Sequence, residues 1–283
     1  MTGSYQELLE SNFGFPFPDD FFRFQDFLEE LKSRGLSLVE NSLGISPANV
    51  FQIFEGASQT SAPASLETAF YKDPPEFVTL LLGDVDGLHW GYYADTPGTL
   101  PYPVAHYYQN DSFELEIDGD LFDAVANHAG DVRQNLEDLI QSDPGSAGQY
   151  RERIHRIDAV LEILATYHKH SPIARRVTAP TRDGMGIVVP DELYAPLLPE
   201  DPFQDASYRP TNDEVRHFQE LAFAALRNGH PGTALKLGKD LWDYVEFFDV
   251  SYELLDNAYT ALARPLLKKR LEYLAQQRKE MSS

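Results

Sequence analysis

The chain has 283 residues, of which 42% are hydrophobic and 12% aromatic, so it can bury a sizeable core and is not globally disordered. This length suits one large or two modest domains, and we predict two. The formal net charge of −22 argues against a broad phosphate-binding surface, so we expect no direct nucleic-acid partner. Because cysteine is absent, disulfides, thiolate zinc sites and a cysteine nucleophile are excluded.

The negative charge is concentrated in the first part of the sequence. Residues 1–120 carry 4 basic and 20 acidic residues, whereas residues 121–283 carry 19 and 25. The N-terminal sequence has neither a basic n-region nor an apolar h-region, and no window approaches the 18 apolar residues of a membrane span. We therefore expect no membrane association and a cytoplasmic protein, or a nuclear one if the source is eukaryotic.

The first half shows helix signals followed by strand signals. Phenylalanines at helical spacing predict a helix over 18–34, and a Ser-, Gly- and Pro-rich stretch at 41–66 predicts a loop with at most short ordered pieces. The runs 76–82 and 88–93 flank Gly83-Asp-Val-Asp-Gly87 and predict a β-hairpin. Further strands are expected at 104–108 and 113–117, giving an antiparallel sheet.

The second half is dominated by helix signals. We predict helices over 119–141, with Asp120 as N-cap, and over 150–168, and the linker between them sets a domain boundary after residue 146. The proline-rich segment 171–212 is expected to be extended, and further helices are expected at 212–228, 232–247 and 251–280. The predicted fold class is α+β, with a sheet and helices in residues 1–146 and a mainly helical subdomain in 147–283.

Common catalytic and metal-binding motifs are absent. The sequence contains no P-loop, dinucleotide fingerprint, nucleophile elbow or zinc-protease helix. His168 and His170 could bind a metal, but basic residues at a helix end suit the helix dipole without one. Asp84 and Asp86 resemble half a calcium loop that lacks its distal glutamate, so we interpret them as a hairpin turn. We predict no metal site and no cofactor.

Two other groups of residues have a structural and a functional interpretation. Six aromatic residues of the predicted sheet could stack a ligand ring or simply pack: Trp90, Tyr92, Tyr93, Tyr102, Tyr107 and Tyr108. The pairs Glu114/Glu116 and Asp118/Asp120 could act as general acid and base, although alternation along an exposed strand explains them more simply. We favour the structural interpretation of both groups.

Five segments, in order along the chain, resemble the histone PARylation factors, accessory proteins of ADP-ribosyltransferases. They are 70–84 (FYKDPPEFVTLLLGD), 91–97 (GYYADTP), 184–190 (GMGIVVP), 235–242 (LKLGKDLW) and 258–264 (AYTALAR). The resemblance implies an α+β front subdomain similar to proteins of the Smi1/Knr4 type, followed by a helical subdomain. It also implies a protein that binds the catalytic domain of a poly(ADP-ribose) polymerase and lends it a glutamate, which redirects ADP-ribose transfer to serine.

The chain departs from this family at the position of that glutamate. A serine hydroxyl is a weak nucleophile until a positioned base accepts its proton, and in the family the base lies just before the segment matched by residues 235–242. Here Asn228 occupies the place, with neighbours Arg227, Gly229 and His230, and an amide cannot take up a proton at neutral pH. His230 is a candidate substitute base because imidazole titrates near neutrality.

We therefore predict a binding or accessory protein rather than an independent enzyme, with the family fold but without the completing glutamate. The expected partner is a protein, either an ADP-ribosyltransferase or an ADP-ribosylated protein, contacted through Tyr194, His230, Asp240 and Trp242. In the family a Tyr-Arg pair contacts the partner, and here alanine follows Tyr194. Compactness and the lack of long disordered tails favour a bacterial source.

Two alternatives remain open. The first is an immunity or scaffold protein of the Smi1/Knr4 type that binds a basic protein through residues 1–120, where charge complementarity would favour fast and selective association. The second is an enzyme in which His230, or a carboxylate outside the matched loop, performs ADP-ribose chemistry alone.

Overall fold

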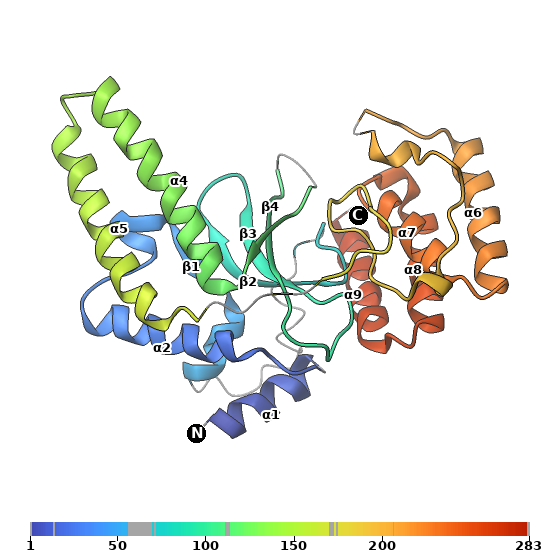
Figure 1. Ribbon diagram of the computed structural model, residues 1–283, viewed down its shortest axis with the longest axis horizontal. Coiled ribbons are helices and arrows are strands. Elements are labelled where there is room, and N and C mark those ends of the chain that lie inside the picture. The colour runs from blue at the N-terminus through green and yellow to red at the C-terminus, as the bar shows by residue number, and fades with distance from the viewer. Residues whose placement is uncertain are drawn as a thin grey trace.

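The computed structural model describes residues 2–13, 15–55, 70, 72–110, 114–169, 173, 175–205 and 207–281. A central antiparallel sheet has one group of helices on each side, and the second group is formed by the C-terminal part of the chain (Figure 1). The α+β fold class is confirmed, with the sheet in the first half and a helical C-terminal part.

The sheet has five strands in sequence order, each antiparallel to the next: β1 (Ile45–Pro47), β2 (Phe77–Gly83), β3 (Leu88–Tyr93), β4 (Val104–Tyr108) and β5 (Glu116–Gly119). The predicted hairpin is β2–β3, and Asp86 in its turn has φ +49°, so the interpretation of Asp84 and Asp86 as a turn is confirmed. The fourth predicted strand begins at 116, later than expected. Strand β1 lies in the stretch that we predicted to be loop, where Ile45 pairs with Gly83.

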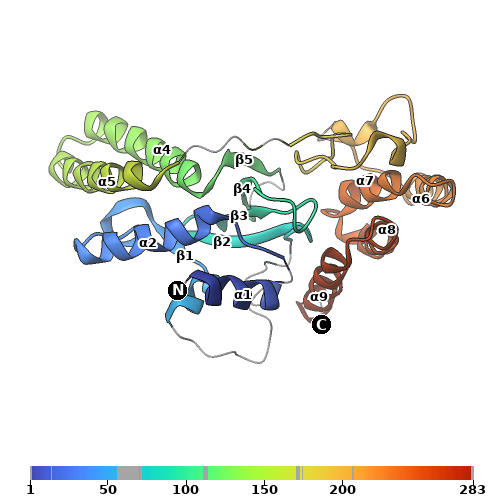
Figure 2. The same cartoon turned by 60° about the horizontal axis from the view of Figure 1, so that its bottom comes forward.

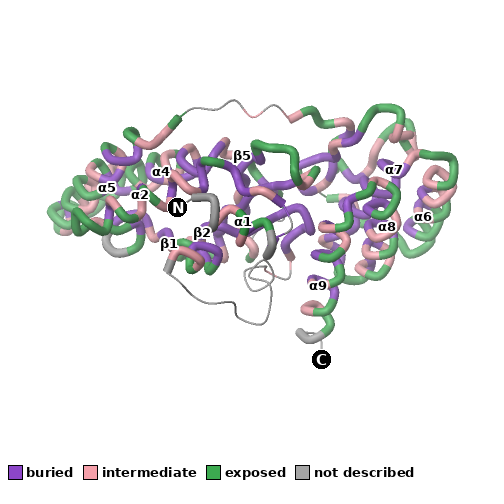
Figure 3. Tube along the Cα trace, turned by 90° about the horizontal axis from the view of Figure 1, so that it is seen from below, coloured by how far each residue is buried: buried purple, intermediate pink, exposed green. Residues whose placement is uncertain are grey.

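Both faces of the central strands are covered, so β3 is buried at every position. Trp90 and Tyr92 belong to the hydrophobic core shared with the N-terminal helices, whereas Tyr93 and Tyr107 belong to a small cluster on the opposite face. Figure 3 shows these strands buried in the middle of the molecule and the outer helical surfaces exposed. The aromatic residues of β3 therefore pack inside the protein, as the structural interpretation predicted.

The helices on the N-terminal side are α1 (Thr2–Phe13), α2 (Asp19–Ser33), α4 (Leu121–Ser142) and α5 (Ala147–Tyr167), with the short segments η1 (Val39–Leu43) and η2 (Asn49–Glu55). Asp120 caps α4 in a capping box with Asp123, which confirms the predicted N-cap. Helix α5, which we expected to begin the second subdomain, packs against α4 and α2 (Figure 2). Along the sequence, the first hydrophobic core consequently ends at Leu164 and the second begins at Ala179. The position after residue 146, where we predicted a domain boundary, lies in the turn between the packed helices α4 and α5.

The C-terminal lobe contains the short segments η3 (Asp191–Leu193), η4 (Pro202–Gln204) and η5 (Val245–Phe247) and the helices α6 (Asn212–Arg227), α7 (Pro231–Leu241), α8 (Phe248–Ala261) and α9 (Pro265–Met281). The single helix predicted over 251–280 is instead two helices, because the chain turns at Ala263, whose φ is +54°. Among the described residues, no helix is long and apolar enough to cross a membrane.

Buried polar side chains join this lobe to the sheet. Tyr259 donates a hydrogen bond to Glu76 Oε1 at 2.7 Å, and Arg270 donates to the backbone carbonyls of Pro75 and Phe77. Lys239, which is 3% exposed, donates to the Tyr93 hydroxyl. The sheet and the C-terminal helices are therefore connected by specific hydrogen bonds as well as by apolar packing.

Candidate functional site

The loop at the position of the family glutamate is a tight helix-ending turn between α6 and α7. The His230 N–H donates to the Ala225 carbonyl at 2.9 Å, and the Gly229 N–H donates to the Leu226 carbonyl at 3.1 Å. This pair of bonds is the Schellman motif, which needs a residue with positive φ just after the helix, and Gly229 supplies it with φ +90°. Pro231 then starts α7 with a φ already suited to a helix.

The turn presents Arg227, Asn228 and Gly229 to solvent. Nothing lies within 4 Å of a Cβ built on Gly229, so the surface around it is open. His230 is partly exposed, and its Nδ1 lies 3.1 Å from the Glu192 carbonyl oxygen. Because a carbonyl can only accept, we assign the hydrogen to Nδ1, which leaves Nε2 of the neutral ring as a proton acceptor.

The segment before and after Tyr194 is fastened to the start of α7. Thr233 Oγ1 donates to the Ala195 carbonyl at 2.7 Å and accepts from the Ala195 N–H at 3.1 Å. A Cβ on Gly232 would lie 2.9 Å from the Leu193 carbonyl oxygen, so glycine is required for this close approach. The loop and the segment around Tyr194 consequently form one fixed surface.

A buried ion-pair cluster lies under this surface. The Lys236 ammonium contacts Asp201 at 2.6 Å and also Asp240, which additionally accepts from the Arg182 N–H at 2.9 Å. Burial raises the pKa of Asp240 to about 6, although the Lys236 charge opposes the rise. The two carboxylates raise the pKa of Lys236 against the effect of its own burial. Burial therefore dominates the pKa of Asp240, whereas its two carboxylate partners dominate the pKa of Lys236.

Beside the cluster lies a mostly apolar hollow of about 660 Å³, which includes the open space at its mouth. Its lining combines aromatic and proline side chains with the ion-pair cluster and includes Tyr194, Thr233 and Phe203. Partial burial raises the pKa of the Tyr194 hydroxyl. Tyr194 and His230, both predicted partner contacts, therefore lie at the surface of the same region.

The other two predicted partner residues lie inside the protein. Asp240 and Trp242 are each 1% exposed. The Trp242 indole N–H donates to the Lys72 carbonyl at 3.0 Å, and the Arg278 guanidinium lies 4.2 Å from the centre of its ring system. This burial speaks against direct contact with a partner and assigns both side chains to the interior of the protein.

Sequence reasoning missed the residues that hold the loop in place, namely Glu192, Gly232 and Thr233. Contacts across 38 positions in the sequence, such as His230 with Glu192 and Thr233 with Ala195, leave no local signal. One sequence feature does point indirectly to these residues: the segment 184–190, which resembles the family, ends just before the residues that contact the start of α7.

Comparison with known proteins shows the relationship over nearly the whole chain. The family model described as Histone PARylation factor 1 matches residues 4–278. The chain belongs to the histone PARylation factor 1 family. It is 29% identical over 304 residues to Histone PARylation factor 1 of Danio rerio, covering 94% of this chain and 84% of the relative. It is 26% identical over 303 residues to the Bos taurus protein of that name, covering 96% and 86%.

Proposed function

We propose that this family member is an accessory protein that docks on the catalytic domain of an ADP-ribosyltransferase through the loop Arg227–His230 and the adjoining segment at Tyr194. The observation that carries the proposal is the fixed surface that these two segments form, at the position where the resemblance places the family's catalytic contribution. Family membership over residues 4–278 supports a role in histone PARylation.

We further propose that docking here does not supply a general base for serine. Asn228 is exposed at the end of α6, but its amide can exchange hydrogen bonds without accepting a proton at neutral pH. The exposed loop residues next to it are Arg227 and Gly229, and neither is a proton acceptor at this pH. The complex would therefore bind and shape the transferase site while leaving serine unactivated, and His230 Nε2 is the remaining proton acceptor of this loop that the experiment must test.

The test is a transfer assay with the purified catalytic domain of the host ADP-ribosyltransferase, NAD and a serine-containing histone peptide. The wild-type chain should bind the domain without promoting serine modification, as read by mass spectrometry. Asn228→Glu should introduce serine transfer, because it places a carboxylate at an exposed helix end with no positive φ to strain. Asn228→Gln has the same length without the charge and is the matched control.

Each result bears on a different part of the proposal. Failure of the wild-type chain to bind would contradict docking, and substitution of Thr233 by valine should weaken docking because it frees Ala195. Serine transfer by the wild-type chain would contradict the loss of the base. In that case, loss of transfer in His230→Gln would identify the imidazole Nε2 as the proton acceptor.

The Smi1/Knr4-like character of the first lobe, the bacterial source and the cytoplasmic or nuclear location stay predictions. The transfer assay separates the leading proposal from the immunity-protein alternative, since only the former requires binding to a transferase. A matched measurement with NAD alone separates it from the enzyme alternative, because an accessory protein should release no nicotinamide without the transferase.

A further inference from the structure

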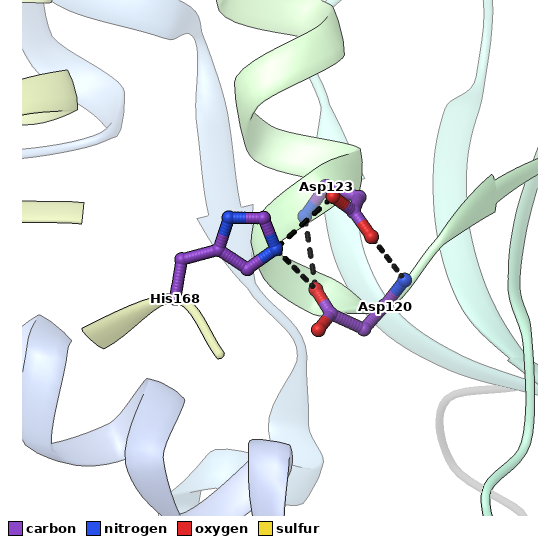
Figure 4. Close-up of side chains that lie close together, drawn as sticks. All are labelled: Asp120, Asp123 and His168. Carbon is purple, nitrogen blue, oxygen red and sulfur yellow. Dashed lines mark hydrogen bonds and ion pairs between the residues drawn. The ribbon is translucent and has the colours of Figure 1, made fainter. Parts of the chain in front are cut away.

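A second group of chemically active side chains lies far from the loop, where α5 ends and α4 begins. Asp120, Asp123 and His168 each offer one ligand atom, and these atoms all lie within 4.8 Å of one another. Figure 4 shows the imidazole of His168 turned toward the two carboxylates at the first turn of α4. His168 Nε2 lies 3.1 Å from Asp123 Oδ1 and 3.8 Å from Asp120 Oδ1.

These separations suit donor atoms around one metal ion. Zinc bonds to nitrogen and oxygen are about 2.0–2.2 Å long, so neighbouring donors of a tetrahedral site lie about 3.4 Å apart. The two measured separations fall on either side of that value. Imidazole nitrogen combined with carboxylate oxygen favours zinc over magnesium or calcium, which prefer oxygen ligands.

An independent observation is the state of the Asp120 carboxylate. Its Oδ1 caps α4 by accepting from the N–H groups of Phe122 and Asp123, at 2.8 and 3.0 Å. The residue is only 4% exposed, so water has little access to it. Its Oδ2 is buried and has no hydrogen-bond partner in the part of the chain that the structure describes. An unsatisfied buried carboxylate oxygen is costly unless a cation or donor completes it.

The surrounding charges also favour a cation. Asp20 is only 7% exposed. Burial raises the pKa of the Asp20 carboxyl, the charge of Asp120 raises it further, and the charge of the Arg23 guanidinium lowers it. Arg23 itself donates to the Tyr167 carbonyl. Of the side chains that the structure describes here, three carboxylates share this corner with one guanidinium and one imidazole, so negative charge is in excess. Asp120 also lines a hollow that opens to solvent, which provides a route for an ion.

We propose that Asp120, Asp123 and His168 bind a zinc ion, with solvent as the fourth ligand. Asp120 would bind through its carboxylate, whose Oδ1 lies 3.8 Å from His168 Nε2 and also caps α4. His168 is the residue at which the chain leaves α5 for the segment leading to the second lobe. The metal would therefore fasten the start of that segment to the N-terminus of α4.

The test is zinc binding to the full chain after treatment with a chelator, measured by calorimetry with zinc alone. The wild type should take up one equivalent, and Asp123→Asn and His168→Gln should each weaken binding roughly tenfold or more. Asp120→Asn should do the same while keeping the fold, because asparagine is as good an N-cap as aspartate. His155→Gln changes an exposed histidine of the same helix and is the matched control.

Cobalt substitution gives a spectroscopic signal that reports metal coordination directly and would not change if His168 had only a structural role. The wild type loaded with cobalt should show visible d–d absorption that His168→Gln loses and His155→Gln keeps. The absence of uptake by the wild type at 100-fold excess zinc would overturn the proposal. Equal uptake by wild type and His168→Gln would overturn it as well.

Discussion

The buried carboxylate of Asp240 gives the sharpest test of the electrostatics under the candidate docking surface. Its pKa in the folded protein is about 6, against 3.8 for an unperturbed aspartate, because burial outweighs the attraction of Lys236. At about 1.36 kcal/mol per pKa unit, this difference amounts to about 3 kcal/mol. Since the folded pKa is raised, the folded state binds the proton more tightly, and stability is lost as pH rises from about 4 through 6.

Asp240→Asn removes this titration while keeping an acceptor for the Arg182 N–H. Integrating the same linkage between pH 5 and pH 8 gives about 1 kcal/mol, so the variant should gain that much free energy of unfolding relative to wild type over this interval. Lys236, whose pKa is raised, keeps its charge and its contact with Asp201 in both proteins. Other titrating groups are common to the two proteins and cancel in the difference.

The measurement is urea unfolding followed by circular dichroism at several pH values, with equal slopes in denaturant required before the free energies are compared. Asp249→Asn, at an exposed position of the same lobe, is the control for the replacement of aspartate by asparagine. A difference between wild type and Asp240→Asn that stays constant from pH 5 to pH 8 would refute the reasoning, because it would mean that Asp240 is equally ionised in the folded and unfolded chains.

Three further substitutions test the packing around the site by the same unfolding measurement. Gly232→Val should lower the free energy of unfolding by about 1–3 kcal/mol, because its side chain would push Leu193 away from α7. The same variant should weaken docking, and unchanged binding would contradict the fixed surface. Gly229→Ala should lower the free energy of unfolding by about 1 kcal/mol, because alanine is strained at the positive φ of this position, and docking should be retained. Tyr259→Phe should cost about 1–3 kcal/mol, since it removes the hydroxyl that satisfies buried Glu76, and a neutral effect would show that water replaces it.

The elements that sequence patterns predicted well are those determined by local chemistry. The β2–β3 hairpin follows from two apolar strands around a glycine-bounded turn, and the N-cap at Asp120 follows from a side chain that serves its own helix. The sequence alone likewise shows that no acidic residue stands between Glu220 and Asp240. Such features need no knowledge of distant contacts.

The features that were missed depend on contacts between distant segments. The turn Asp143–Ala147 has the composition of a domain linker, yet it joins two helices that share one core, and only the packing of Ile157 and Val160 reveals this. The end of α8 at Ala263 depends on a left-handed backbone that no helix-breaking residue marks. The grouping of His168 with Asp123 likewise joins positions 45 apart, which periodicity cannot detect.

The uneven charge of the chain is partly explained by how its two lobes meet. Among the described residues of the first 120, four acidic side chains are buried, namely Asp20, Asp73, Glu76 and Asp120, so they contribute nothing to an acidic outer surface. Cationic side chains of the second lobe reach across to the first: Lys239 to the Tyr93 hydroxyl, Arg264 to Thr96, and Arg270 to carbonyls of β2 and the residues before it.

Some of the acidic side chains of the first lobe and some of the basic side chains of the second are therefore used inside the molecule, where buried charges require partners. This weakens the case for a purely electrostatic partner of residues 1–120, since fewer carboxylates remain to attract one. It strengthens the case for the loop at Asn228 as the docking element, because the contacts of Lys239 hold α7, and with it the turn before α7, in a defined position relative to the sheet.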